Sequence, residues 1–215
     1  CAHRQIGMSF FSPRGKFLAR TVGEEYGNVL LRKEQYRISD DGERSTAYAK
    51  NMITGKIYNK RWSIERTLRA HAYRVDAEKL KQISNVLYES LNRVQEVSAL
   101  DELRGVEGKA AEQYFSVFHD LILNQKEDFS FTGRNRRPPL DPVNALLSFA
   151  YTILAGECAN ALYSVGLDPY VGFMHGDRPG RTSLALDMME ELRPILADRF
   201  ILTLMNTKAI QAVHF

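Results

Sequence analysis

Apolar residues recur at gaps of three and four after Asp76, and this period constrains the fold more than any other feature of the sequence. They form one stripe along a predicted helix, made of Leu80, Ile83, Leu87, Leu91 and Val94. A helix turns once every 3.6 residues, so the stripe lies on one face and needs a partner to cover it. Asp76 is suited to cap the first turn. From about Asp40 onward, the chain is therefore predicted to fold as packed helices.

Glycines and a capping sequence predict the next helix. Ser98-Ala99-Leu100-Asp101 resembles a capping box in which Asp takes the place of the usual Glu. Gly105 and Gly108 follow, and a helix is predicted after them, through about Leu123.

The C-terminal half has clearer boundaries. Residues 124–140 are polar, basic and rich in Pro, which predicts a loop. Asp141-Pro142 begins a long predicted helix, because Asp is a preferred cap and Pro a preferred first helical residue. This helix is expected to end at Gly166. Ser183 begins another helix, which Pro194 should interrupt.

Residues 1–37 carry strand signals instead. Two runs, Ile6–Phe11 and Lys16–Arg20, flank Ser12-Pro13-Arg14-Gly15, whose Pro and Gly suit a type I hairpin turn. A hairpin alone is marginal in water, so further strands are expected upstream of Cys1. The predicted fold class is α+β, with the remnant of an N-terminal β domain at 1–37 and a mainly α-helical domain at 38–215.

Composition narrows the class of protein. The chain has 215 residues, of which 44% are apolar and 26% charged, as in ordinary soluble domains. No apolar run approaches the roughly 20 residues that a membrane helix needs, so no membrane partner is expected. Cys1 and Cys158 suggest no disulfide framework, which favours a reducing cytoplasm. The net charge of +3 is too small to indicate nucleic-acid binding by itself.

A histidine and several carboxylates near the C-terminus have the spacing of a metal site. Asp187 and Glu190 are three residues apart, so one helix face presents both, and Glu191 shares that face. His175 lies on a loop with Gly and Pro that is able to fold over them. Such a set suits Mn²⁺ or Mg²⁺ better than zinc, because most ligand atoms are hard oxygens. By spacing alone, a solvated acidic turn beside a hydrogen-bonded histidine is the more common structure.

Two other segments carry candidate residues. Glu107 lies between two glycines, where spacing alone favours an ordinary helix start. Arg134, Arg136 and Arg137 are three arginines within four residues, which suits bidentate binding of phosphates. A short basic loop more often neutralises neighbouring carboxylates or stays solvated, so both interpretations remain open.

Taken in succession, these segments resemble the large adaptation subunit of CRISPR systems, CRISPR-associated protein one, over nearly the whole chain. The resemblance rests on the three clusters above and on four further stretches: Cys1-Ala2, Met8-Ser9-Phe10-Phe11, Gly27-Asn28-Val29-Leu30-Leu31-Arg32 and Gly55-Lys56-Ile57-Tyr58-Asn59. The arginine loop and the stretch His175-Gly176-Asp177-Arg178-Pro179-Gly180-Arg181 look most like the type I branch, subtype C. The family's chain is expected to begin upstream of Cys1 and to continue past Phe215.

The resemblance implies a helical domain that holds one divalent metal ion, Mg²⁺ or Mn²⁺. The matching positions make Glu107, His175 and Glu190 the expected metal ligands and catalytic residues, with Asp187 as a further ligand or as their support. Two more arginines match basic positions near the DNA, so the expected DNA-binding residues are Arg134, Arg136, Arg137, Arg178 and Arg193.

The implied activity is that of a metal-dependent DNA endonuclease and integrase of the prokaryotic cytoplasm. It inserts prespacer DNA into the repeat DNA of a CRISPR array by phosphodiester transesterification. Expected partners are both DNAs, a second copy in a homodimer of the full-length protein, and the small adaptation subunit, CRISPR-associated protein two. Two alternatives are a non-catalytic DNA-binding scaffold with a structural acidic cluster and a purely helical interaction protein.

Neighbouring glutamates compete for the last ligand position. Relative to Asp187, Glu191 lies about 40° to one side of the helix and Glu190 about 60° to the other, which slightly favours Glu191. The family pattern instead places the ligand three residues after the Asp. We therefore predict Glu190 as the ligand and Glu191 as an ordinary charge at the rim.

Overall fold

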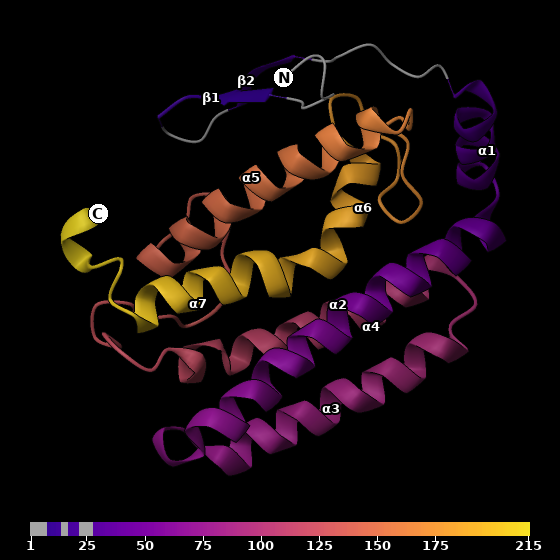
Figure 1. Cartoon of the computed structure of the whole chain (residues 1–215). Helices are drawn as coiled ribbons and strands as arrows, with labels where there is room; N and C mark the ends of the chain where they lie inside the picture. Colours follow the sequence, from indigo (N-terminus) through magenta and orange to yellow (C-terminus); the bar gives the residue numbers. More distant parts are fainter. Residues whose placement is uncertain (1–7, 14–16, 22–27) are drawn as a thin grey trace.

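The computed structural model describes residues 8–13, 17–21 and 28–215 and is mainly helical (Figure 1). One two-stranded antiparallel sheet precedes the helices within this part of the chain, which confirms the α+β class. The strands and helices, in chain order, are β1 Met8–Phe11, β2 Phe17–Thr21, α1 Val29–Ser39, α2 Gly42–His71, η2 Ala72–Arg74, α3 Ala77–Glu96, α4 Leu100–Ser116, η3 Phe118–Leu121, α5 Pro142–Ser164, α6 Ser183–Leu192, η4 Arg193–Asp198, α7 Arg199–Asn206 and η5 Ala212–His214.

The predicted N-terminal hairpin is present. β1 and β2 pair from Met8 opposite Thr21 to Phe11 opposite Phe17, with an irregularity after Phe10. The turn residues Arg14 and Gly15 and the residue Cys1 lie outside the described residues. A Cβ placed on Gly156 would lie 3.2 Å from the ring of Phe11, so the hairpin contacts α5 at a glycine.

The prediction of β structure up to residue 37 is wrong for residues 29–37, which belong to α1. Asn28 caps this helix, since its side chain accepts a hydrogen bond from the amide of Leu31 at 3.2 Å. Gln35 on α1 is buried and donates to the carbonyls of Asp168 and Val171. These contacts with a distant loop outweigh the strand preference of the apolar run Val29-Leu30-Leu31.

The helices form two layers. One layer consists of α2, α3 and α4, which lie side by side, the other of α5 and α7, and α6 joins the two (Figure 1). The predicted apolar stripe is confirmed: Leu80, Leu87 and Val94 are fully buried, and the other two members pack against the same core. The side chain of Asp76 caps α3 by accepting from Lys79 N at 3.0 Å. This packing fixes α2 and α4 against each other.

The prediction that a helix begins after Gly105 and Gly108 is wrong. α4 begins at Leu100 after an N-cap residue, Ala99, whose side chain makes no capping bond. Glu102 instead accepts from the amide of Ser98 at 3.2 Å. Both glycines lie inside the helix, at a cost of about 1 kcal/mol each relative to alanine, and burial of Leu103, Ala110 and Tyr114 offsets it. Glu107 therefore projects from the middle of α4.

The boundaries of α5 and α6 match the prediction, whereas α4 ends at Ser116, short of the predicted end at Leu123, and the 3₁₀-helix η3 follows it. Asp141 caps α5 by accepting from Asn144 N at 2.7 Å, and Gly166 follows the helix with a φ of 84°. By length and composition α5 is apolar enough to span a membrane, which is weak evidence because core helices also meet this test. Pro194 interrupts the last helices, and the chain passes from α6 through the π-helix η4 into α7.

Candidate metal centre

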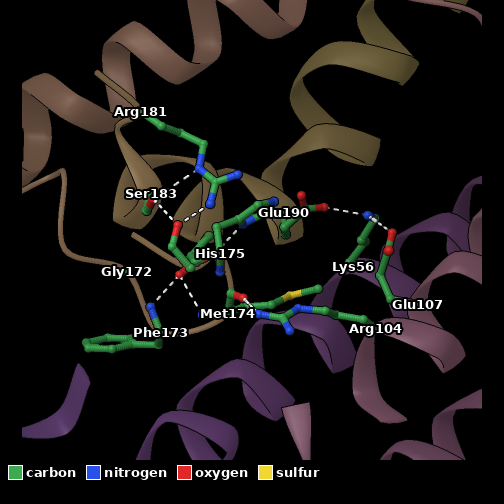
Figure 2. A network of polar contacts seen from close by, with 12 residues as sticks. Lys56, Arg104, Glu107, Gly172, Phe173, Met174, His175, Arg181, Ser183 and Glu190 are labelled. Atoms are coloured by element: carbon green, nitrogen blue, oxygen red, sulfur yellow. Dashed lines mark hydrogen bonds and ion pairs between the residues drawn. The ribbon is translucent and has the colours of Figure 1, made fainter. Parts of the chain in front are cut away.

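Two predicted ligands, Glu107 on α4 and Glu190 on α6, meet at a lysine on α2 (Figure 2). The ammonium of Lys56 forms an ion pair with Oε1 of Glu107 and lies 2.5 Å from Oε2 of Glu190. The side chains of Lys56 and Glu190 are only 5% and 4% exposed, whereas Glu107 is 20% exposed. The site thus opens towards solvent on the side of Glu107.

Close packing of α6 on α2 places Glu190 at this point. A Cβ on Gly55 would lie 3.0 Å from Cβ of Glu191, so the glycine allows the two helices to approach. The amide of Asn59 donates to the carbonyl of Glu191 at 2.8 Å, close to where α6 passes into the π-helix. Glu191 therefore packs at the contact between α6 and α2, while its neighbour Glu190 points at Lys56.

Two positive charges hold Glu190 ionised. Arg193 Nη1 lies 3.0 Å from its Oε1, opposite the contact with Lys56. Burial by itself would raise the pKa of Glu190, but Lys56 and Arg193 outweigh it and hold this pKa at about 2. Arg193 is itself largely buried, with its guanidinium 5.0 Å from the ring centroid of Tyr151. The structure therefore places Arg193 as an internal partner of Glu190.

The third predicted ligand, His175, is oriented by Asp187. Its Nδ1 lies 2.5 Å from Oδ1 of the aspartate. A carboxylate only accepts hydrogen bonds, so Nδ1 donates to it, and the neutral form of the ring keeps a lone pair on Nε2. A carboxylate that fixes the imidazole in this way is typical of metal-binding histidines.

Asp187 also fixes the loop before His175. Its carboxylate accepts from the backbone amides of Phe173, Met174 and His175 at 2.7, 2.9 and 3.0 Å, and its side chain is fully buried. Because both oxygens are engaged, the geometry favours the supporting role of Asp187 over that of a direct ligand.

Two further residues hold this loop in place. A Cβ on Gly172 would lie 2.8 Å from Oδ2 of Asp187, so the backbone reaches the carboxylate only with glycine there. Arg104, one turn before Glu107 on α4, donates to the carbonyl of Met174 (Figure 2). The loop of His175 is consequently tied to both helices that carry the predicted carboxylate ligands.

The donor chemistry fits a hard divalent cation, although the side chains are not gathered around one point. Among the residues that the structure describes, no three His, Cys, Asp or Glu side chains form a group that could hold a metal ion. An imidazole nitrogen and two carboxylates suit Mg²⁺ or Mn²⁺. The carboxylates of Glu107 and Glu190 already hold one cation between them, the ammonium of Lys56.

The predicted DNA-binding arginines differ in their environment. Arg134 is half-buried; it donates to Oδ1 of Asn144 at 2.7 Å and to Oγ of Ser148 at 3.0 Å. Burial lowers the pKa of Arg134. Arg136, Arg137 and Arg178 are exposed. A cavity of about 410 Å³ lies beside Arg134 and Arg136. Only the exposed arginines present their guanidinium groups to solvent.

Sequence reasoning assigned no role to Lys56 or Arg104. A signal for the lysine exists: Lys56 and Lys60 fall on the apolar face of α2, at helical spacing from Ile53, Ile57 and Ile64. All of these side chains are buried. Burial and nearby Lys56 lower the pKa of Lys60 to about 7. A lysine in an apolar stripe indicates a buried charge partner.

Comparison with known proteins identifies the family of this chain. The chain matches the family described as "CRISPR associated protein Cas1" over residues 1–215. It is 46% identical, over 215 residues, to "CRISPR-associated endonuclease Cas1 1" of Chlorobaculum tepidum, in a match that covers 100% of this chain but 63% of that relative. The chain thus spans less than two thirds of the length of this curated relative.

Solved structures share the fold. A casposase bound to its integration product superposes with a TM-score of 0.81 at 27% identity, over 98% of this chain and 56% of that one. A Cas6-RT-Cas1–Cas2 complex superposes with a TM-score of 0.78 at 27% identity, over 97% of this chain and 22% of that one. Since the family match extends over every residue of the sequence, the chain belongs to the Cas1 family of CRISPR-associated proteins.

Proposed function

We propose that this chain is the catalytic part of a metal-dependent DNA endonuclease and integrase that inserts prespacer DNA into a CRISPR array. The observation that carries this proposal is the meeting of Glu107 and Glu190, from two different helices, around the buried ammonium of Lys56. The Chlorobaculum relative is named an endonuclease, and the casposase of similar fold is bound to an integration product, which supports the same chemistry.

The proposed reaction exchanges one phosphodiester bond for another. The 3′-hydroxyl oxygen of a prespacer strand forms a new bond to a phosphorus atom of the repeat DNA, and the 3′-oxygen of the repeat strand leaves and takes up a proton. A divalent ion held by Glu107, His175 and Glu190 would polarise the phosphoryl oxygen and favour deprotonation of the attacking hydroxyl. Asp187 orients the imidazole for this task, and Arg104 holds its loop.

DNA and a small adaptation subunit are the proposed partners. A neighbour in structure is a complex that contains Cas1 and Cas2, which supports the second partner. Homodimerisation through the N-terminal β domain, the cytoplasmic location and the subtype C assignment follow from the resemblance and stay predictions.

Removal of divalent ions tests the proposed activity. In the full-length protein, EDTA is expected to abolish strand transfer into repeat DNA and to leave DNA binding nearly unchanged, because the arginines contact phosphate without a metal. Adding Mn²⁺ or Mg²⁺ in excess should restore the reaction. A protein that binds DNA equally with and without chelator but transfers no strand at any metal concentration would be the non-catalytic scaffold instead.

The exposed arginines of the 124–140 loop test DNA binding separately from chemistry. Replacing Arg136 and Arg137 by Ala should weaken binding to unrelated DNA sequences alike, because phosphate contacts carry no sequence information. It should also flatten the slope of log K against log salt by roughly two, about one for each lost contact. Arg134 is kept, since its bonds to Asn144 and Ser148 make its loss a structural change.

A matched control removes the same charge elsewhere. Lys81 and Arg93 are exposed on α3, and their double alanine variant should keep the wild-type slope. Equal slopes for the wild type and the Arg136→Ala, Arg137→Ala variant in a salt titration would show that these arginines do not contact DNA.

A further inference from the structure

Lys56 occupies the space between the two carboxylates that the proposed function assigns to a metal ion. Its ammonium contacts one oxygen of Glu107 and one of Glu190, 2.5 Å away in the second case, and its side chain is almost fully buried. With Arg193 on the other oxygen of Glu190, the cluster contains two negative and two positive charges. These four side chains are therefore balanced in charge without any metal ion.

A divalent ion and this ammonium exclude each other at such short range. An ion that binds both carboxylates would lie within a few ångströms of Lys56, and two cations in a buried site repel strongly because little water screens them. Lysine concentrates its charge at the end of a flexible four-carbon chain, so its ammonium is able to move while α2 stays fixed. The buried neighbours Ile53 and Ile57 anchor the helix itself.

We propose that Lys56 is a built-in competitor of the divalent ion. It holds Glu107 and Glu190 in position while no metal is bound, and the incoming ion displaces it. This inference rests on the proposed metal-dependent function. Lys60, one turn further along α2, is a second buried lysine, so it disfavours movement of Lys56 in its direction. The exposed side of the site, beside Glu107, is the direction left to the ammonium.

Metal affinity separates this role from that of a permanent structural ion pair. In the full-length protein, Lys56→Met removes the competing charge and keeps the length of the side chain. We expect it to bind Mn²⁺ more tightly than the wild type, on the order of tenfold, as is typical of two sites coupled in this way. Calorimetric titration with MnCl₂ measures this directly, and loss of the binding heat in Glu107→Ala assigns it to this site.

Thermal unfolding provides a second readout. Without metal, Lys56→Met leaves two neighbouring carboxylates with less compensation, so its Tm should lie below that of the wild type. Added Mn²⁺ should then raise the Tm of Lys56→Met by more than it raises that of the wild type. Lys56→Arg keeps the charge and should bind Mn²⁺ no more tightly than the wild type.

Lys79 offers a matched control, because its ammonium pairs with the carboxylate of Asp120, 2.7 Å away, and not with the carboxylates of this site. Lys79→Met should leave the affinity for Mn²⁺ within about twofold of the wild type, since screened surface charges act weakly at a distance.

If Lys56→Met is folded without metal and binds Mn²⁺ no more tightly than a wild type that does bind it, the competitor role is overturned and the proposed function is left standing. Absence of Mn²⁺ binding in both proteins overturns the proposed function as well. If Lys56→Met folds only in the presence of Mn²⁺, the competition is supported in its strongest form. If it stays unfolded at saturating Mn²⁺, Lys56 is a structural residue and the inference is wrong.

Discussion

Glu190→Gln is expected to reduce metal-dependent strand transfer by the full-length protein on the order of 1000-fold, because loss of a ligand removes several kcal/mol of charge stabilisation. Glu191→Gln is expected to change it by less than about threefold, because Gln keeps the shape of this half-buried side chain where it packs against Gly55. Gln keeps the shape of Glu, so the difference reports charge at one position. Glu190 is the buried glutamate that contacts Lys56 and Arg193, whereas Glu191 packs against Gly55.

Kinetics of strand transfer at several Mn²⁺ concentrations measure both variants, with circular dichroism to show that each is folded. Glu190→Gln should stay inactive at saturating Mn²⁺, because the missing negative charge cannot be replaced by more metal. If the Glu191 variant is the inactive one, the orientation of α6 at the site is wrong by one residue. Matching losses in both variants would indicate a general effect of negative charge on this helix.

Asp187→Ala should destabilise the protein by about 3 kcal/mol or more. Its carboxylate accepts from three backbone amides of residues 173–175 and from the ring of His175. A buried donor without a partner costs about 1–3 kcal/mol, and the alanine also leaves a small cavity. For a chain of this size, such a loss lowers the Tm by roughly 6–12 °C. Activity should be lost as well, because the imidazole of His175 is no longer oriented.

Thermal unfolding and hydrogen exchange of residues 172–176 measure this effect. Asp168→Ala is the matched control, because Asp168 lies on the same connection between α5 and α6. Its carboxylate accepts hydrogen bonds from the amide of Tyr170 and the hydroxyl of Tyr36, near the surface. Its loss should cost only about 1 kcal/mol, as is typical of an exposed hydrogen bond. Wild-type stability and exchange rates in Asp187→Ala would show that the loop before His175 does not depend on this carboxylate.

Fold elements with a strong local signal could be predicted from the sequence. The stripe of α3 and the ends of α5 are encoded by nearby residues, because hydrophobic period, Asp caps, Pro and Gly act within a few positions. The wrong predictions concern segments whose secondary structure is decided by contacts with residues far away in the sequence. Residues 29–37 look like a strand but form α1. The side chain of Gln35 holds this helix to the distant loop by hydrogen bonds to the backbone of Asp168. The glycines near Glu107 suggest a helix start, yet core packing carries α4 through them.

For the site, the sequence by itself determined the family and the chemical kinds of the candidate ligands, because motifs keep their residue types in chain order. Only the tertiary structure decided how they are paired. Glu107 and Glu190 lie on different helices, and their meeting at Lys56 depends on how α2, α4 and α6 pack. The same packing turns Glu190 inward and Glu191 towards Gly55, and it commits Asp187 to the His175 loop. Ion pairs and burial act through space at a few ångströms, so sequence spacing within one helix does not reveal them.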